Sequence, residues 1–303
     1  SFFRYPGGKS KLREQIVRTL SVQTGDRDLQ YREPFFGGGS IGLKLLQDNP
    51  QIKSIWINDK DIGIACLWTS VIRYLKQFQS RVNDFVPSVA AFHEFKTYLS
   101  ALNVMPTSVD EIVDVGFKKL AIHQISYSGL GTKSGGPLGG EEQKSNYKID
   151  CRWSPKYIRN KAEKLHRLFA GLKVHGNECT NLDFSDVISP STPEALIYLD
   201  PPYYVKGNEL YQHGFTETDH RRLACALETS RHTWLLSYDD CPEIRDMYSW
   251  SAFHSLNVKY SITATKKGTK RLSTEKPELL IYPKDKDLSN VYSDSNQVAG
   301  VFD

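Results

Sequence analysis

The sequence lacks the patterns that most directly indicate a metal site, a disulfide framework or a membrane span. Its five cysteines are scattered without a C-x-x-C pair, and no H-E-x-x-H motif is present. No apolar run reaches the roughly 18 residues that a membrane-spanning helix needs, and the N-terminus has no signal-peptide pattern. We therefore expect a cytoplasmic protein with reduced thiols, no resident metal and no membrane contact.

A complete phosphate-binding loop is also missing. Residues 4–12, RYPGGKSKL, contain the Gly-Lys-Ser triplet of such a loop. The signature G-x-x-x-x-G-K-[ST] requires a glycine five positions before Gly8, and Phe3 stands there. No apolar strand precedes the triplet either, so the sequence does not favour an ATPase, and the glycines and the lysine need another explanation.

The charge is low overall but unevenly distributed. A net charge of +4 is a weak argument for a polyanionic partner. Between residues 133 and 173, however, ten Lys or Arg stand against four acidic residues, and between residues 259 and 276 six stand against one. The two stretches could bind one polyanion together, whereas for either stretch alone a solvated surface is an equally good explanation.

Short apolar runs that end in polar residues predict buried strands. The run at 52–57 meets Asn58-Asp59, the run at 195–199 meets Asp200-Pro201-Pro202-Tyr203, and two more runs cover 233–238 and 278–282. Helical segments are expected at 41–46 and 218–229. Strands that alternate with helices indicate an α/β domain with a mostly parallel sheet.

The pattern changes between residues 66 and 173. Apolar residues recur at helical spacing over 67–85, 92–102 and 112–125, a glycine-rich loop covers 126–146, and a basic helix is expected to begin near Pro155. We therefore expect a catalytic domain formed by residues 1–65 and 174–283, an inserted helical domain at 66–173 and a polar tail at 284–303.

Three glycines and an acid form the first candidate site. Gly37, Gly39 and Gly42 fit G-x-G-x-x-G, which allows a tight turn from strand to helix and close approach of a ligand to the backbone. Asp59 follows Gly39 by 20 residues, at the end of the next predicted strand, where a carboxylate can accept both hydroxyls of a ribose. This spacing fits a dinucleotide and S-adenosylmethionine equally well.

The second candidate site is Asp200-Pro201-Pro202-Tyr203, at the end of an apolar strand. An exocyclic amine of adenine or cytosine is a poor nucleophile because its lone pair is delocalised into the ring. If the Asp200 carboxylate and the Pro201 carbonyl accept its two N–H hydrogens, the nitrogen can direct that lone pair at a methyl group. Tyr203 would stack on the base, which has to leave the duplex to reach such a pocket.

With these motifs the sequence resembles the Dam-like (alpha-group) N6-adenine-specific DNA methyltransferases over nearly its whole length. FRYPGGKSKL resembles the N-terminal cofactor motif of that family, EPFFGGGS its glycine loop, and DPPY its catalytic motif; further matches are Asn58-Asp59, the segment 181–184 and the later segments 215–220 and 260–282. The resemblance implies an α/β, Rossmann-like S-adenosylmethionine-dependent methyltransferase sheet with a mainly helical, inserted target-recognition domain.

The resemblance also implies roles for individual residues. Asp200, Pro201 and Tyr203 would be catalytic. The S-adenosyl-L-methionine contacts would be Tyr5, Lys9, Glu33, Phe35, Gly37, Gly39, Ser40, Asp59, Asp183, Phe184 and Asp200. Asp200 and Glu33 would place negative charge near the sulfonium ion.

DNA contacts are expected in the basic stretches. The segment 126–133 could enter the duplex, and the helix over 156–167 could lie along phosphates. The candidate residues are Ser126, Tyr127, Lys133, Arg152, Lys156, Arg159, Lys267 and Arg271. No residue indicates which bases are read.

Together these features predict an enzyme, a site-specific DNA methyltransferase that acts on N6 of a flipped-out adenine in duplex DNA. We expect a monomer, with a restriction endonuclease of the same system as a compatible partner. Cytosine N4 methylation and RNA adenine methylation remain alternatives, because the same amine chemistry serves them. A nicotinamide-dependent oxidoreductase built on Gly37, Gly39 and Gly42 is a more distant alternative that gives DPPY no role.

Overall fold

The computed structural model describes residues 2–3, 9, 12–24, 29–205, 214–261, 273–286 and 288. Three predicted site residues, Tyr5, Lys267 and Arg271, lie outside these residues. The same holds for most of the predicted polar tail and for residues 262–272.

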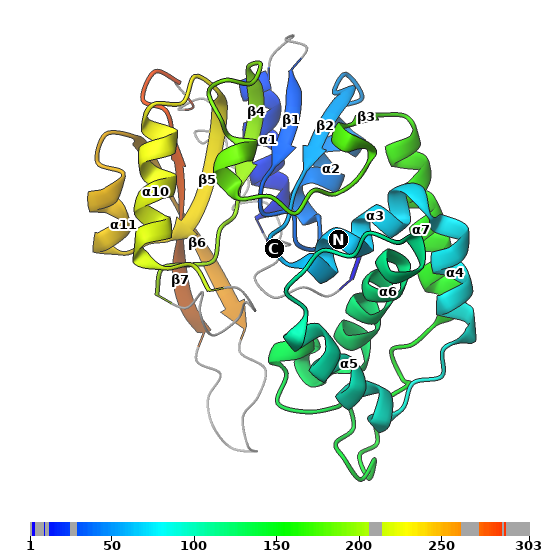
Figure 1. The fold of residues 1–303 in the computed structure, drawn as a ribbon. Coiled ribbons are helices and arrows are strands. Elements are labelled where there is room, and N and C mark those ends of the chain that lie inside the picture. The colour runs from blue at the N-terminus through cyan, green and yellow to red at the C-terminus, as the bar shows by residue number, and fades with distance from the viewer. Residues whose placement is uncertain are drawn as a thin grey trace, which may run out of the picture.

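A seven-stranded sheet forms the centre of the described chain, in the order β3-β2-β1-β4-β5-β7-β6 (Figure 1). The first five strands in this order are parallel to one another. β7 runs antiparallel to both of its neighbours, β5 and β6. The strands are β1 (Gln30–Glu33), β2 (Ser54–Ile57), β3 (Lys173–Val174), β4 (Ala195–Leu199), β5 (Thr233–Asp239), β6 (Ala252–Ser261) and β7 (Ser273–Tyr282). This confirms the predicted α/β fold with a mostly parallel, Rossmann-like sheet.

The strand register brings the carboxyl ends of three strands together. β1 lies between β2 and β4, with Glu33 opposite Ile57 and Arg32 opposite Ile197. Every residue of β4 is buried, as expected of a parallel strand covered on both faces. The residues that follow β1, β2 and β4 therefore lie together at one edge of the sheet.

Helices cover the sheet on both sides. They are α1 (Arg13–Thr24), α2 (Ser40–Asp48), α8 (Phe184–Val187), α10 (Glu217–Glu228) and α11 (Pro242–Met247). The start of α10 is fixed by a capping box, in which the Thr216 hydroxyl accepts from Asp219 N–H and the Asp219 carboxylate accepts from Thr216 N–H. Figure 1 shows α10 and α11 beside β5, at the opposite end of the sheet from β3.

The predicted inserted segment is helical, as expected. It contains α4 (Leu75–Asp84), α5 (Val89–Ala101), α6 (Val109–Ile125), α7 (Pro155–Ala170) and most of α3 (Ile62–Arg73), with short 3-10 turns at η1 (Tyr127–Gly129) and η2 (Gly131–Lys133). A third such turn, η3 (His175–Asn177), follows β3. Ser154 caps α7 and Pro155 opens it, so the basic helix begins where predicted. Figure 1 shows α3 to α7 gathered beyond β2 and β3.

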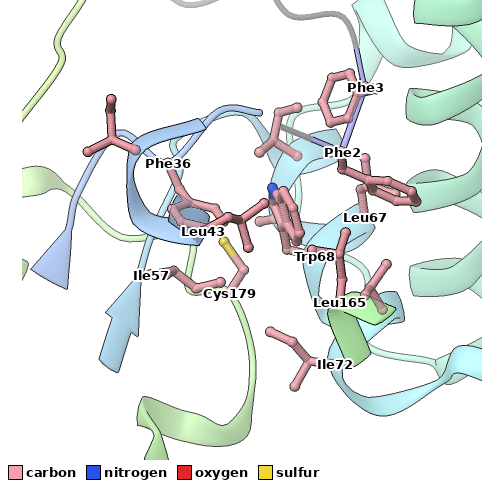
Figure 2. Close-up of a cluster of buried hydrophobic side chains, with 14 of the residues drawn as sticks. Phe2, Phe3, Phe36, Leu43, Ile57, Leu67, Trp68, Ile72, Leu165 and Cys179 are labelled. Atoms are coloured by element: carbon pink, nitrogen blue, oxygen red, sulfur yellow. The ribbon is translucent and has the colours of Figure 1, made fainter. Parts of the chain in front are cut away.

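The inserted helices share one hydrophobic core with the sheet domain. Trp68 of α3 packs edge-on against Phe36, with ring centroids 4.9 Å apart, and donates a hydrogen bond from Nε1 to the Gly37 carbonyl at 2.8 Å. Figure 2 shows Trp68 among Phe2, Phe36 and Leu67. The predicted boundary at residue 66 falls inside α3, and the division of the chain into domains stays a prediction.

Helices α3 and α6 approach each other closely at Gly116. A Cβ atom added there would lie 2.7 Å from the Cys66 carbonyl oxygen. We expect Gly116→Ala to lower the free energy of unfolding by about 2 kcal/mol, because overpacking outweighs the helix propensity of alanine. Urea denaturation measures this change.

The matched control is Gly171→Ala, since a Cβ atom there would meet nothing nearer than 3.7 Å and the backbone φ is −83°. Its stability should stay within about 0.5 kcal/mol of the wild type. Equal effects of the two substitutions would contradict the close approach of α3 and α6.

Candidate active site

Three carboxylates lie at the ends of neighbouring parallel strands. Glu33 is the last residue of β1, Asp59 follows β2 by two positions, and Asp200 directly follows β4. The order β2-β1-β4 makes these three strands adjacent. In open α/β sheets this edge, outside the carboxyl ends of the strands, is where ligands bind.

The glycine turn between β1 and α2 wraps over the end of β2. Gly37 and Gly39 have φ values of 47° and 64°, which glycine adopts without strain. The Gly37 N–H donates to Asp59 Oδ2 at 2.7 Å. A Cβ atom on Gly42 would lie 2.4 Å from Glu33 Oε2, so all three glycines of the predicted motif have a structural reason. Ser40 begins α2.

Asp59 is a buried carboxylate held by backbone donors. Besides the contact from Gly37, its Oδ1 accepts the Asp61 N–H at 2.9 Å. Its own carbonyl accepts from Asn181 Nδ2 at 2.8 Å. Burial, reinforced by the charge of Asp61, raises the pKa of Asp59 to about 7.

Glu33 is buried between the other two carboxylates. Burial raises its pKa well above the ordinary value, although the Tyr31 hydroxyl donates to Oε2 at 2.6 Å and opposes that shift. The charges of Asp200 and Asp59 raise its pKa further. A positively charged ligand at this edge of the sheet would offset the cost of ionising Glu33.

Lys9 joins the DPPY motif to β7. Its Nζ lies 2.6 Å from Asp200 Oδ1 and 3.1 Å from Glu278 Oε1, and Lys9 and Glu278 are only 4% and 3% exposed. The Tyr203 hydroxyl donates to Glu278, and the Lys9 ammonium also contacts Tyr203. Glu278 was not predicted as a site residue, because its sequence context indicates only a buried strand.

Two residues of β5 hold the DPPY turn. Ser237 Oγ donates to Asp200 Oδ1 at 3.0 Å. Asp239 accepts the N–H groups of Tyr204 and Val205, each at 3.0 Å, so the backbone after the two prolines is fixed from a neighbouring strand. Neither residue was predicted, since nothing in the sequence pairs them with DPPY.

Phe35, two residues after Glu33, belongs to a cluster of three phenylalanine rings. Phe35 contacts Phe184 and Phe215, with ring centroids 5.9 and 5.7 Å apart. Asp183 caps α8 through Ser185 and pairs with Arg222 at 2.8 Å. Burial alone would raise the pKa of Asp183, but these hydrogen bonds lower it, so its carboxylate already has partners.

The predicted DNA contacts that the structure describes differ in their exposure to solvent. Ser126 is fully buried and its hydroxyl accepts the Gly131 N–H at 3.1 Å, so its prediction as a DNA contact is wrong and it supports the loop instead. Tyr127, in contrast, is 66% exposed. The basic candidates Lys133, Arg152, Lys156 and Arg159 are exposed as well.

The comparisons with known proteins agree with this geometry. A family model described as D12 class N6 adenine-specific DNA methyltransferase matches residues 5–262. No curated protein matches the chain. The family match gives no support to a nicotinamide-dependent oxidoreductase.

Two features are absent from the described residues. Among them, no helix is long and apolar enough to cross a membrane. No group of three or more His, Cys, Asp or Glu in that part of the chain could hold a metal ion.

The contacts of Glu278 predict a role in stability. Glu278→Ala should lower the free energy of unfolding by about 2 kcal/mol, because the buried Lys9 ammonium and the Tyr203 hydroxyl each lose an acceptor. Thermal and urea unfolding measure the change. Glu228→Ala, at an exposed position near the end of α10, is the control and should change stability little; a similar effect of both would refute the structural role of Glu278.

Proposed function

Since this chain belongs to the D12 class N6 adenine-specific DNA methyltransferase family, an enzyme family that methylates adenine in DNA, we propose that its DPPY site transfers the methyl group of S-adenosyl-L-methionine to a flipped-out adenine. The observation that carries this proposal is the set of three carboxylates on adjacent strand ends, Glu33, Asp59 and Asp200. A nucleoside and an amine can be bound side by side there.

The proposed role of Asp200 is to accept hydrogens of the adenine amine. Among the described residues, the hydrogen bonds to Asp200 all reach Oδ1, which leaves Oδ2 as an acceptor for substrate. The Pro201 carbonyl is the second proposed acceptor, and the Tyr203 ring is proposed to stack on the base. Ser237, Asp239 and Glu278 hold these groups before substrate arrives, which favours reaction by orientation.

The residues at the glycine turn fit S-adenosyl-L-methionine. Each oxygen of Asp59 accepts one backbone hydrogen and has a further lone pair for a ribose hydroxyl. Gly37 and Gly39 allow close approach of the ligand to the backbone, with Ser40 beside them, and Glu33 provides negative charge near a cation. When bound, the cofactor supplies an electrophilic methyl group on a sulfonium ion.

The adenine of the cofactor is proposed to lie against Phe35 and Phe184. Because these two rings already contact each other, the base would pack beside them rather than between them. Asp183 would have to share its carboxylate with Arg222 to bind that base. Tyr5 lies outside the described residues, and Lys9 is proposed to reach the cofactor from its position beside Asp200.

The DNA interface is proposed to include Tyr127 and the exposed basic residues Lys133, Arg152, Lys156 and Arg159. α7 buries Ile158 and Leu165 against the other helices and leaves its basic residues in solvent, as a phosphate contact requires. Duplex DNA as substrate, base flipping, a monomeric state, a cytoplasmic location and a restriction endonuclease partner remain predictions.

The function is tested by transfer of labelled methyl groups from S-adenosyl-L-methionine to mixed-sequence duplex DNA, followed by digestion to nucleosides. We expect N6-methyladenine from the wild type, and a rate reduced about a hundredfold or more by Asp200→Ala. Asp246→Ala, at an exposed position in α11, is the control and should retain full activity.

Other products would overturn parts of the proposal. N4-methylcytosine would change the target base and keep the amine chemistry. Incorporation into RNA but not into DNA would remove the DNA substrate. Activity of Asp200→Ala equal to that of the wild type would exclude the DPPY carboxylate from the reaction.

Cofactor affinity should depend on pH through Asp59. Its raised pKa of about 7 means that the carboxylate ionises as pH rises through neutrality, and the ionised form accepts ribose hydroxyls best. The affinity for S-adenosyl-L-methionine should therefore be about ten-fold weaker at pH 6 than at pH 8. Calorimetric titration measures this, and an unchanged pH profile in Asp59→Asn would assign the titration to another group.

A further inference from the structure

A lysine of the inserted segment reaches the turn after β2. Lys119 of α6 is 4% exposed in its side chain, and its Nζ lies 2.6 Å from Asp61 Oδ2. Its aliphatic chain covers Gly63, where an added Cβ atom would lie 2.8 Å from Lys119 Cδ. The close approach of α3 and α6 at Gly116 brings Lys119 within reach of Asp61.

Asp61 connects this lysine to Asp59. Its Oδ1 caps α3 by accepting the Ile64 N–H at 3.1 Å, while Oδ2 binds Lys119. The Asp61 N–H donates to Asp59 Oδ1 at 2.9 Å. A continuous chain of contacts therefore runs from α6 through Asp61 and Asp59 to the Gly37 N–H.

The same helix holds the loop that carries Tyr127. His123 lies one turn after Lys119, and its Nδ1 is 2.8 Å from the Gly129 carbonyl oxygen. The His123 ring also packs against Gly131, whose φ is 60°. One rigid element thus contacts both the carboxylate turn after β2 and the exposed loop proposed to meet DNA.

We propose that Lys119 is a positioning residue that holds the Asp59 carboxylate ready for the cofactor ribose and so makes cofactor binding depend on the inserted helices. The inference rests on the proposed contact of Asp59 with the ribose. Asp59 and Asp61 are like charges within one turn, and Lys119 offsets their repulsion without occupying the oxygens of Asp59.

The charge of Lys119 acts among several titratable groups. Among the described residues, those that face Asp59 or its partner Asp61 include Asp61 in the same turn, Cys66 on α3, Lys119 and His123 on α6, Glu33 on β1, and Cys179 before β4. Of these, Lys119 favours the ionised form of Asp59, whereas Asp61 and Glu33 oppose it. Loss of Lys119 should therefore move the ionisation of Asp59 to higher pH.

The test compares two adjacent lysines of α6. Lys119→Met should weaken binding of S-adenosyl-L-homocysteine about fivefold at pH 7, because a rise of about one unit in the pKa of Asp59 lowers its ionised fraction at that pH from about a half to about a tenth. Lys118→Met is the matched control, because Lys118 pairs with Asp114 on its own helix at 2.5 Å, and its affinity should equal that of the wild type. Binding is measured by calorimetry on the full chain.

Two further readouts separate positioning from a merely structural role. In Lys119→Met the midpoint of the pH dependence of binding should move up by about one unit, whereas a loosened fold would lower affinity at all pH values. In steady-state assays at pH 7, KM for S-adenosyl-L-methionine should rise about fivefold with kcat within about twofold of the wild type. Lys119→Gln keeps a hydrogen-bond donor for Asp61 and loses the charge. It replaces Lys119→Met in both measurements if Lys119→Met does not fold.

A double-substitution cycle distinguishes failure of this inference from failure of the ribose assignment. If Lys119 acts through Asp59, Lys119→Met should have no further effect on affinity in an Asp59→Ala background. Unchanged affinity in Asp59→Ala alone would refute the ribose contact itself. If Asp59→Ala weakens binding and Lys119→Met does not, or if their effects simply add, the inference about Lys119 is wrong.

Discussion

The concentration of carboxylates at one edge of the sheet is the constraint on which the rest of the structure depends. Glu33 ends β1, and Asp59 and Asp200 follow the adjacent strands β2 and β4; burial penalises the charged forms of Glu33 and Asp59. Backbone N–H groups and the Lys119 ammonium offset this cost at Asp59, and the Lys9 ammonium pairs with Asp200. The remaining negative charge suits a cationic ligand, so the electrostatic requirement of the fold and the chemistry of a sulfonium cofactor agree.

The two lysines come from segments outside the sheet, which makes the site a product of the whole chain. Lys9 belongs to the N-terminal segment, and Lys119 belongs to an inserted helix. Trp68 ties the glycine turn to the same helices through its hydrogen bond to the Gly37 carbonyl. A substitution in the inserted helices can therefore alter the proposed cofactor site, even though the sequence suggests two separate units.

The elements predicted best from sequence are those whose local pattern is decisive. A continuous apolar run before Asp200 predicted β4, and Ser154-Pro155 predicted the start of α7. β1 is harder to recognise, because two of its four residues are charged; Arg32 is buried only because carbonyls of a distant loop accept its hydrogens. Glu278 and Lys119 could not be assigned to the site, since their partners lie far away in the sequence.

The antiparallel strand β7 explains why the DPPY turn is held so firmly. Asp239 of β5 pairs in register with Glu278 of β7. Asp239 fixes the backbone after the two prolines, while Glu278 binds the Tyr203 hydroxyl and Lys9. One register pair therefore holds both the backbone and the aromatic ring of the DPPY turn. A one-residue slip of β7 would send the Glu278 side chain to the other face of the sheet, so the geometry of the DPPY turn depends on the pairing of β5 with β7.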